Sequence, residues 1–471
     1  MLMRYFDRFG ENKDVFKQQS KSRAVQVERK LLTELEKWRL NSQRKPLILQ
    51  GARQVGKTWL LKEFARRSYK NFAYVNFDEN PGIKELFSSD LRIDRLLKLL
   101  SFETGVTINA HEILLIFDEI QECPRALTAL KYFCEEARDI HVVAAGSLLG
   151  LTVHEGSGFP VGKVNMLSLF PMSFEEFLSS SKNGEKLARV IASGDPELLK
   201  LYSAQLREEF KLYLFVGGMP EVVSSFRRNS QWQDARTVQE EILQGYRFDI
   251  SKRLNGKELE HVLAVFESIP QQLAKENRRF VFSKIRESAR ARDYQKAIVW
   301  LTNAGIAVKV PRVTKPRIPL SSYQEQSIFK FFLADVGLLG AMAGLNPSSV
   351  LAGNTLFNEF KGALTEQFVR QQLQSALDLK PYYWSADNSR GEIDFLVQDR
   401  CDHGNSKVVA IEVKAEENLK AKSLKAFKDR YPEILALRLS LSDLREQDWM
   451  CNVPLYAFSN RCFWLKSDQN Q

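Results

Sequence analysis

The stretch GARQVGKT, residues 51–58, decides the fold of the first part of the chain. It matches the phosphate-loop pattern of glycine, four residues, glycine, lysine, and serine or threonine. A short apolar run, residues 47–50, precedes it, and residues 58–67 follow with the apolar period of a helix. Such a loop turns its N–H groups toward phosphate at the positive end of the helix. The sequence therefore predicts a nucleotide phosphate site.

Each position of this loop receives a predicted role. Lys57 is expected to reach the β- and γ-phosphates, and the hydroxyl of Thr58 is expected to bind Mg²⁺. ATP and Mg²⁺ are therefore the expected cofactors. The predicted nucleotide contacts of the loop are Gly51, Ala52, Arg53, Gln54, Val55, Gly56, Lys57 and Thr58.

A second motif, ILLIFDEI at residues 113–120, ends an apolar strand with two acids. Asp118 would lie at the carboxyl end of the strand, where ligands collect in a parallel sheet, and is predicted to hold Mg²⁺ directly or through water. Glu119 is predicted to polarise the attacking water. An acidic pair that only caps the next helix is the alternative interpretation.

Further catalytic candidates follow from the same chemistry. Ser147, after the strand at 141–145, is predicted to sense the γ-phosphate, with a plain turn serine as the alternative. The predicted catalytic set is thus Lys57, Glu119 and Ser147. Three arginines are candidates for a finger, and the sequence favours none of them: Arg125, Arg247 and Arg253.

Four regions are predicted along the 471 residues. Residues 1–170 form the P-loop core with an N-terminal helix over 22–40, because apolar strands at 47–50, 72–77, 112–117 and 141–145 alternate with helices. Residues 171–255 form a helical lid that begins with the capping residues Ser173 and Glu176. Residues 256–330 form a winged helix-turn-helix, from helices at 259–273, 283–289 and 290–304 and a strand at 306–310. Residues 331–471 form an α/β domain with a helix at 357–377 and strands at 392–398 and 407–415.

Most of the net charge of +10 comes from one segment. Residues 275–317 contain twelve basic and three acidic residues, which leaves +9. The helix over 290–304 has an apolar face and an opposite polar face that could enter a DNA groove. The predicted DNA contacts are Arg290, Arg292, Gln295 and Lys296. A spacer or a protein-binding module remains the alternative, because charge runs are usually solvated faces.

The C-terminal region contains residues typical of a metal-dependent nuclease. Asp394 lies on the strand GEIDFLV, and Glu412 and Lys414 lie on one face of the strand VVAIEVKA, because side chains alternate. Carboxylates would bind Mg²⁺ while the lysine orients or deprotonates water. Asp394 and Glu412 are the predicted metal ligands, and Glu366, from the helix upstream, completes the predicted nuclease site with Lys414. A fold of this kind that is kept only for docking is the alternative.

These motifs together carry a resemblance over nearly the whole chain. The matching pieces are GARQVGKT, LIFDEIQ, AAGS, FPMSFEEF, FVGGMPEVV, FKFFLADVGLL, FKGALTEQFV, YYWSADNSRGEIDFLV and AIEVK. The sequence resembles the bacterial and archaeal ATP-binding proteins that join an AAA-type ATPase core to a C-terminal domain of unknown function with a restriction-endonuclease-like fold. The resemblance implies an α/β protein: a P-loop NTPase parallel sheet with a helical lid, a winged helix-turn-helix and a C-terminal restriction-endonuclease-like α/β domain.

Composition excludes several other classes. Hydrophobic residues make up 44% and charged residues 27%, which excludes a collagenous or wholly disordered chain. The five cysteines are scattered without metal-ligand spacing, and no apolar run has the length of a membrane span. We therefore expect a cytoplasmic protein without a membrane partner.

Three functions fit these observations. The first is an ATP-hydrolysing switch that moves the C-terminal parts of the chain. Its partner would be DNA, another protein or further copies of the same chain. The second is an ATP-gated, metal-dependent nuclease, and the third is a nucleotide-dependent DNA-binding regulator with little turnover. The sequence does not decide the oligomeric state, the arginine finger, the DNA preference or the physiological role.

Overall fold

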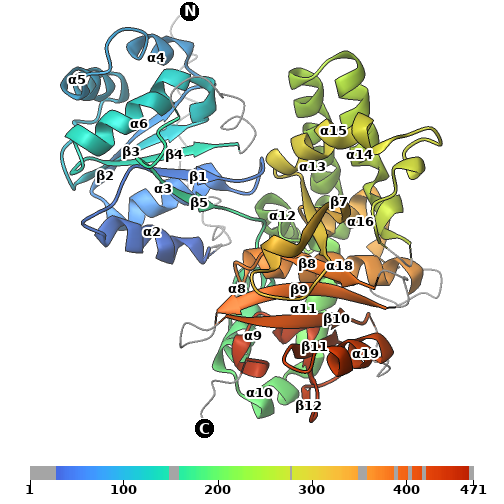
Figure 1. The fold of residues 1–471 in the computed structure, drawn as a ribbon. Helices are drawn as coiled ribbons and strands as arrows, with labels where there is room; N and C mark the ends of the chain where they lie inside the picture. The colour runs from blue at the N-terminus through green and yellow to red at the C-terminus, as the bar shows by residue number, and fades with distance from the viewer. Residues whose placement is uncertain are drawn as a thin grey trace, which may run out of the picture.

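The computed structural model describes residues 28–147, 159–275, 278–347, 358–386, 391–400, 406–415 and 421–465. Part of the predicted helix over 22–40, and residue 357 of the predicted helix over 357–377, lie outside these ranges. Figure 1 shows two sheets joined by a helical region.

The first sheet is five-stranded and parallel, in the order β2-β3-β4-β1-β5. Its strands are β1 (Leu47–Gln50), β2 (Asn71–Asn76), β3 (Ile113–Asp118), β4 (His141–Gly146) and β5 (Asn165–Ser168). Helices α2 (Leu31–Leu40) and α3 (Lys57–Ser68) cover one face, and α4 (Pro81–Leu86), α5 (Ile93–Thr104) and α6 (Pro124–Glu136) cover the other. The predicted α/β class with a parallel sheet is confirmed, because strands buried on both faces need helices on both sides.

The predicted start of the first helix is wrong for the described residues before Leu31. Residues 28 and 29 lie outside the helix, and the Arg29 side chain turns into the protein, where it pairs with Glu176. The backbone N–H of Lys30 donates to the same carboxylate. The helix therefore begins only after these contacts.

A helical region follows β5 and packs into the same core as α2 and α3. Its helices are α8 (Phe174–Ser179), α9 (Lys182–Ser193), α10 (Pro196–Leu201), α11 (Ser203–Val216), α12 (Pro220–Asn229) and α13 (Trp232–Arg253). Ser173 and Glu176 form the predicted capping box at the start of α8. The sharp turn between α11 and α12 needs glycine, since Gly217 has φ 75° and a Cβ on Gly218 would lie 2.2 Å from the carbonyl oxygen of Met172.

Two further helices and a hairpin come next: α14 (Gly256–Leu273), α15 (Ala291–Asn303), and the antiparallel strands β6 (Ala307–Val313) and β7 (Gln324–Leu333). The predicted helix over 283–289 is wrong, because only the 3₁₀ turn η3 (Phe282–Lys284) forms there. Phe282, Ile285 and Ala289 pack against the core. The N–H groups of Lys284, Ile285 and Ala289 each donate to the carbonyl oxygen three residues earlier, so short turns replace the bonding of an α-helix.

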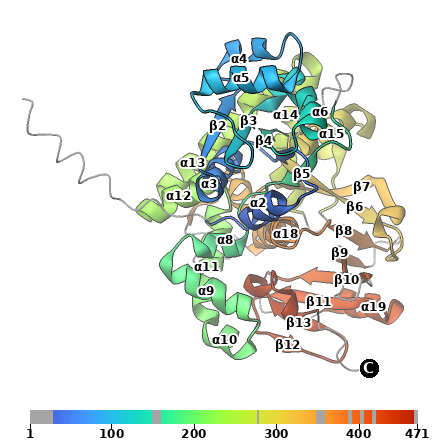
Figure 2. The same cartoon turned by 90° about the vertical axis from the view of Figure 1, so that its left-hand side faces the viewer.

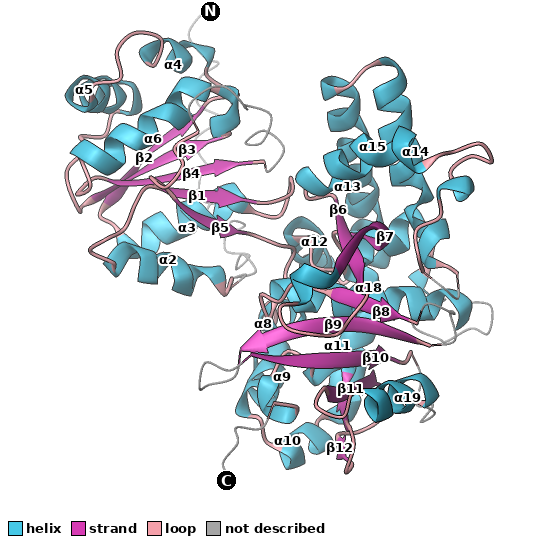
Figure 3. Cartoon of the chain, viewed as in Figure 1, coloured by secondary structure: helices cyan, strands magenta, loops and turns pink. Residues whose placement is uncertain are grey.

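The second sheet has eight strands in the order β12-β13-β11-β10-β9-β8-β6-β7. Figure 3 shows its strands from β6 to β12 in magenta. Its remaining strands are β8 (Tyr382–Ser385), β9 (Glu392–Arg400), β10 (Ser406–Val413), β11 (Leu435–Ser440), β12 (Arg445–Glu446) and β13 (Cys451–Pro454). The β6–β7 hairpin belongs to this sheet because β6 pairs in parallel with β8. The domain boundary predicted at residue 330 therefore falls inside β7.

Helices cover both faces of the second sheet. Helices α16 (Val336–Met342) and α18 (Asn358–Ser375) share the core of the helical region, and α19 (Lys422–Arg430) packs on the opposite face. In Figure 2 the parallel sheet lies near the top and the second sheet near the bottom, with α8 to α11 along one side.

Short 3₁₀ turns are η2 (Ile120–Glu122), η4 (Leu320–Tyr323), η6 (Leu455–Ala457) and η7 (Arg461–Phe463). None of the described helices has an apolar stretch long enough to cross a bilayer.

Candidate nucleotide site

The loop between β1 and α3 adopts a tight, left-handed course. Gly56, the residue before α3, has φ 91°, and Gln54 has φ 64°. A Cβ on Gly51 would lie 2.3 Å from the carbonyl oxygen of Leu169, so only glycine fits there. The loop thus packs tightly against the chain after β5 and leads directly into the N-terminus of α3, where a phosphate cradle lies.

Lys57 lies folded over this loop. Its Nζ donates to the carbonyl oxygens of Gly51 at 3.0 Å and Ala52 at 2.8 Å, and the residue is only 7% exposed. Burial lowers the pKa of Lys57 to about 8, although the nearby carboxylates of Glu119 and Asp118 oppose this shift. The Lys57 ammonium donates to neutral carbonyl oxygens, and a bound phosphate would give it a strongly negative partner.

The oxygens of Thr58 and Asp118 meet at the end of β3. Thr58 Oγ1 donates to Asp118 Oδ2 at 2.6 Å, and the hydroxyl of Tyr74 donates to the same oxygen at 2.9 Å. A hydroxyl beside a carboxylate is a donor set that Mg²⁺ prefers, so the residues present fit this ion. Tyr74 was not predicted, although a tyrosine on the strand next to β3 is a usable signal.

Glu119 and Ser147 lie at the same edge of the sheet. Glu119 follows Asp118 with φ 49°, and its carboxylate accepts a hydrogen bond from Gln121 Nε2. Ser147 is buried directly after β4, the strand between β3 and β1. The structure thus brings the residues predicted for ATP hydrolysis to one edge.

Helix α13 of the helical region contacts this loop. The hydroxyl of Tyr246 donates to the carbonyl oxygen of Arg53 at 3.2 Å, and the guanidinium of Arg53 pairs with Asp249 at 3.2 Å. Arg253 pairs with the same carboxylate at 3.1 Å and lies 3.8 Å from Glu122, just past the second motif. Sequence reasoning missed Asp249, because no local pattern distinguishes it from a solvated helix acid.

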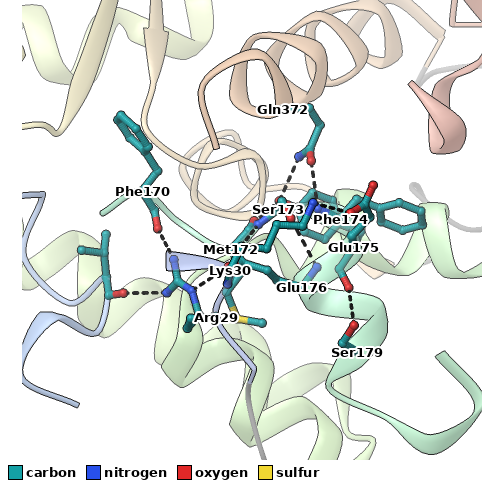
Figure 4. A network of polar contacts seen from close by, with 12 residues as sticks. Arg29, Lys30, Phe170, Met172, Ser173, Phe174, Glu175, Glu176, Ser179 and Gln372 are labelled. Carbon is teal, nitrogen blue, oxygen red and sulfur yellow. Dashed lines mark hydrogen bonds and ion pairs between the residues drawn. The ribbon is translucent and has the colours of Figure 1, made fainter. Parts of the chain in front are cut away.

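A buried arginine joins the loop to the start of the helical region (Figure 4). The guanidinium of Arg29 donates to Glu176 Oε1 at 3.2 Å, to the carbonyl oxygen of Val55 at 3.0 Å and to that of Phe170 at 2.6 Å. The chain next to Glu176 is in turn tied to α18, since the N–H of Phe174 donates to Gln372 Oε1 at 2.9 Å. The phosphate loop is therefore connected by polar contacts to the C-terminal part of the chain.

The three arginines considered as fingers have intramolecular partners. Arg125 donates to the carbonyl oxygens of Phe87 and Ser89, and Arg247 pairs with Glu267 at 2.7 Å. Only Arg253 lies beside the nucleotide motifs of its own chain.

In the C-terminal part, Glu366 and Asp394 meet around a lysine that was not predicted. Lys330 Nζ lies 2.6 Å from Glu392 Oε1, 3.4 Å from Glu366 Oε2 and 3.8 Å from Asp394 Oδ1. Burial, together with the charge of Glu366, raises the pKa of Asp394 to about 7. Burial opposes ionisation of Glu366 too, but Arg278 and Lys330 outweigh it and lower its pKa.

Glu412 and Lys414 form a separate pair, with Lys414 Nζ 3.0 Å from Glu412 Oε1. Their neighbours Ile411 and Val413 face the core of α18, and Ala410 faces that of α19, so alternation places Glu412 on the α19 side. Glu412 Oε2 is buried without a hydrogen-bond partner among the described residues. Across those residues, no group of three His, Cys, Asp or Glu side chains is arranged to hold a metal ion. The metal role of Asp394 and Glu412 stays a prediction.

The basic segment divides into paired and exposed residues. Arg278 pairs with Glu366, and Arg312 pairs with Glu325 at 3.4 Å, so part of the charge is neutralised internally. The side chains predicted to contact DNA are exposed at the start and along the outer face of α15: Arg290, Arg292, Gln295 and Lys296. Their DNA contacts stay a prediction.

Comparisons with known proteins agree with the first part of this description. Residues 43–178 match a family described as an AAA domain. Residues 207–349 and 361–457 match two families described as domains of unknown function, DUF8612 and DUF4143. The chain therefore carries an AAA-type P-loop domain followed by two domains of unknown function. A comparison with curated proteins gives no match.

Several solved structures are distantly similar. The Walker-type ATPase of Pyrococcus abyssi has 16% identity, covering 67% of this chain and 96% of that chain, with a TM-score of 0.45. The ORC2 protein of Aeropyrum pernix in its ADP form has 15% identity, coverages of 73% and 98%, and a TM-score of 0.32. The ORC1 protein of the same organism in complex with DNA has 14% identity, coverages of 67% and 90%, and a TM-score of 0.28. These likenesses are too distant to assign a function.

Proposed function

We propose that the protein is a Mg²⁺-dependent ATPase that acts as a nucleotide-driven switch. The observation that carries the hydrolytic part is the convergence of Lys57, Thr58, Asp118 and Glu119 at one sheet edge. The AAA-domain match over residues 43–178 supports the same class of reaction.

Different residues of the chain have different roles in the proposed hydrolysis. The loop amides and Lys57 hold the β- and γ-phosphates, while Thr58 and Asp118 would hold Mg²⁺, which neutralises phosphate charge when bound. Glu119 accepts a proton from the attacking water, and Gln121 orients its carboxylate. Ser147, at the end of the neighbouring strand, reports whether the γ-phosphate is present.

The contacts between α13 and the phosphate loop are the basis of the proposed switch. Arg53 belongs to the phosphate loop, yet its guanidinium is paired with Asp249 of the helical region. Phosphate competes with a carboxylate for an arginine, because both accept the same charged hydrogen bonds. Nucleotide binding therefore draws Arg53 from Asp249 and loosens the contact between the loop and α13.

Duplex DNA is the proposed partner of the moving part. Helices α14 and α15 with the β6–β7 hairpin keep part of the element order of a winged helix, with the 3₁₀ turn η3 in place of its middle helix. The exposed cations of α15 would neutralise phosphates. A cytoplasmic location fits this role. A protein partner or self-assembly is the alternative use of the same surface.

A nuclease gated by ATP is the second candidate. The buried, unpartnered Glu412 Oε2 beside Lys414 is the observation that favours it. A regulator that binds nucleotide and DNA with little turnover is the third.

One experiment separates these functions. Phosphate release from ATP is measured with and without duplex DNA, beside a nicking assay with Mg²⁺ or Mn²⁺ on the same sample. Lys57→Ala is compared with Lys70→Ala, which removes an equally charged but exposed side chain at the opposite end of the sheet. We expect hydrolysis that Lys57→Ala abolishes and Lys70→Ala retains. Nicking without hydrolysis would favour the nuclease, and DNA binding without either activity would favour the regulator.

A further inference from the structure

Lys330 is the most completely enclosed cation of the C-terminal part that the structure describes. It lies on β7, its side chain has no exposed surface, and three carboxylates surround its ammonium. Two of the three, Glu392 and Asp394, come from β9, and Glu366 comes from α18. Strand β7, strand β9 and helix α18 therefore meet at one charged point.

Ionised carboxylates gathered around one atom repel each other, and a nearby cation or protonation of one of them relieves this repulsion. Lys330 supplies one positive charge, and Arg278, paired with Glu366 from the other side, supplies a second. The ring of Tyr383 lies beneath the ammonium, with its centroid 5.2 Å from Nζ. The cluster thus has its own cations inside the fold.

A divalent ion and this ammonium exclude each other. Mg²⁺ binds carboxylate oxygens at about 2.0–2.1 Å, between the same oxygens that Lys330 contacts. With Nζ 2.6 Å from Glu392 Oε1 and 3.4 Å from Glu366 Oε2, an ion placed between these two oxygens would take the position of the ammonium. The repulsion of the two cations in a buried site would outweigh the added coordination.

We propose that Lys330 is the resident cation of the Glu366–Glu392–Asp394 cluster and takes the place of a metal ion there. The cluster then serves as a metal-independent tether, which fastens strand β7 to α18 and to strand β9. This inference concerns the C-terminal part alone and stands whether or not the P-loop hydrolyses ATP.

The tether makes a gain-of-function variant possible. Lys330→Met keeps an unbranched side chain of similar length but removes the cation that contacts all three carboxylates. A cluster with that excess of negative charge should bind a cation from solution. The variant is therefore expected to acquire the metal site that the wild type lacks.

The test uses the full chain without nucleotide and Mn²⁺ as the probe. Bound ions are counted by electron paramagnetic resonance, and the melting temperature is followed with and without Mn²⁺. The wild type and Asp394→Asn should bind the same number of ions. Lys330→Met should bind one more ion, and Lys330→Met combined with Asp394→Asn should lose it.

A matched control removes a lysine from the same hairpin. Lys309 on β6 is partly exposed and donates to the carbonyl oxygen of Gln326 at 2.7 Å, so Lys309→Met should gain no ion. An ion in the wild type that Asp394→Asn removes would overturn the proposal, and this comparison holds even where Lys330→Met does not fold. A folded Lys330→Met protein without an extra ion would overturn it too.

Discussion

The buried pair of Arg29 and Glu176 offers a quantitative test of how the phosphate loop is anchored. Both side chains are almost fully buried, at 4% and 6% exposure. Removing one member of such a pair costs roughly 3–5 kcal/mol, because the other charge stays buried without its partner. Arg29→Met keeps most of the side-chain volume and removes the charge.

Two features of the site change this cost in opposite directions. Glu176 keeps two backbone donors in the variant, the N–H groups of Lys30 at 2.8 Å and Ser173 at 2.9 Å. These two remaining donors favour the lower part of the range of roughly 3–5 kcal/mol. The carbonyl oxygens of Val55 and Phe170 lose a charged donor at the same time, which adds about 1–3 kcal/mol if they are left unsatisfied. We therefore expect Arg29→Met to lower the free energy of unfolding by about 3–5 kcal/mol.

Urea denaturation of four proteins measures this coupling: the wild type, Arg29→Met, Glu176→Gln and the double variant. The double variant should be less destabilised than the sum of the single variants by at least about 1 kcal/mol. Arg67→Met is the control, because Arg67 forms a surface pair with Glu63 whose loss should cost less than about 1 kcal/mol. Additive effects, or an Arg29→Met cost no larger than that of the control, would refute the anchoring role.

Three further predictions concern the proposed activity. Lys57→Ala should remove most ATP affinity in a direct binding assay. The ATP affinity of the wild type should fall above about pH 8, because Lys57 loses its proton there when no nucleotide is bound. ATP binding that is independent of Lys57 and of pH would contradict this prediction. Asp249→Asn should tighten ATP binding several-fold by releasing Arg53 and removing a buried carboxylate near the phosphates, whereas unchanged or weaker binding would exclude the proposed competition. Replacing Arg292 and Lys296 together should lower the salt slope of DNA binding by about 2. A variant with Lys37 and Lys70 replaced is the control. If both double variants show the same salt slope of DNA binding, the surface of α15 contacts a protein instead.

The sequence predicted the features that depend on neighbouring residues. The phosphate loop, the strand that ends at Asp118 and the capping box of Ser173 each lie within a few positions, and each appears as predicted. The helix over 283–289 was the local exception, because its few apolar residues pack through a 3₁₀ turn instead.

Contacts between distant segments were not predictable. Arg29 and Glu176 are 147 positions apart, and Lys330 and Glu366 are 36 apart, so no periodicity connects either pair. Lys330 stands between aromatic residues on β7, where alternation alone cannot tell a buried cation from an exposed one. Only the fold shows that this lysine faces Asp394, which the sequence assigned to a metal, together with Glu366 and Glu392.

Hydrolysis by Glu119 is the central claim, and one measurement tests it most directly. Phosphate release with Mg²⁺ and ATP is compared between the wild type and Glu119→Gln, with binding of a fluorescent nucleotide measured on both proteins. The account predicts equal nucleotide affinity and a loss of turnover of about 10²–10⁴-fold, because only the proton acceptor is removed. Equal turnover in the two proteins would contradict it.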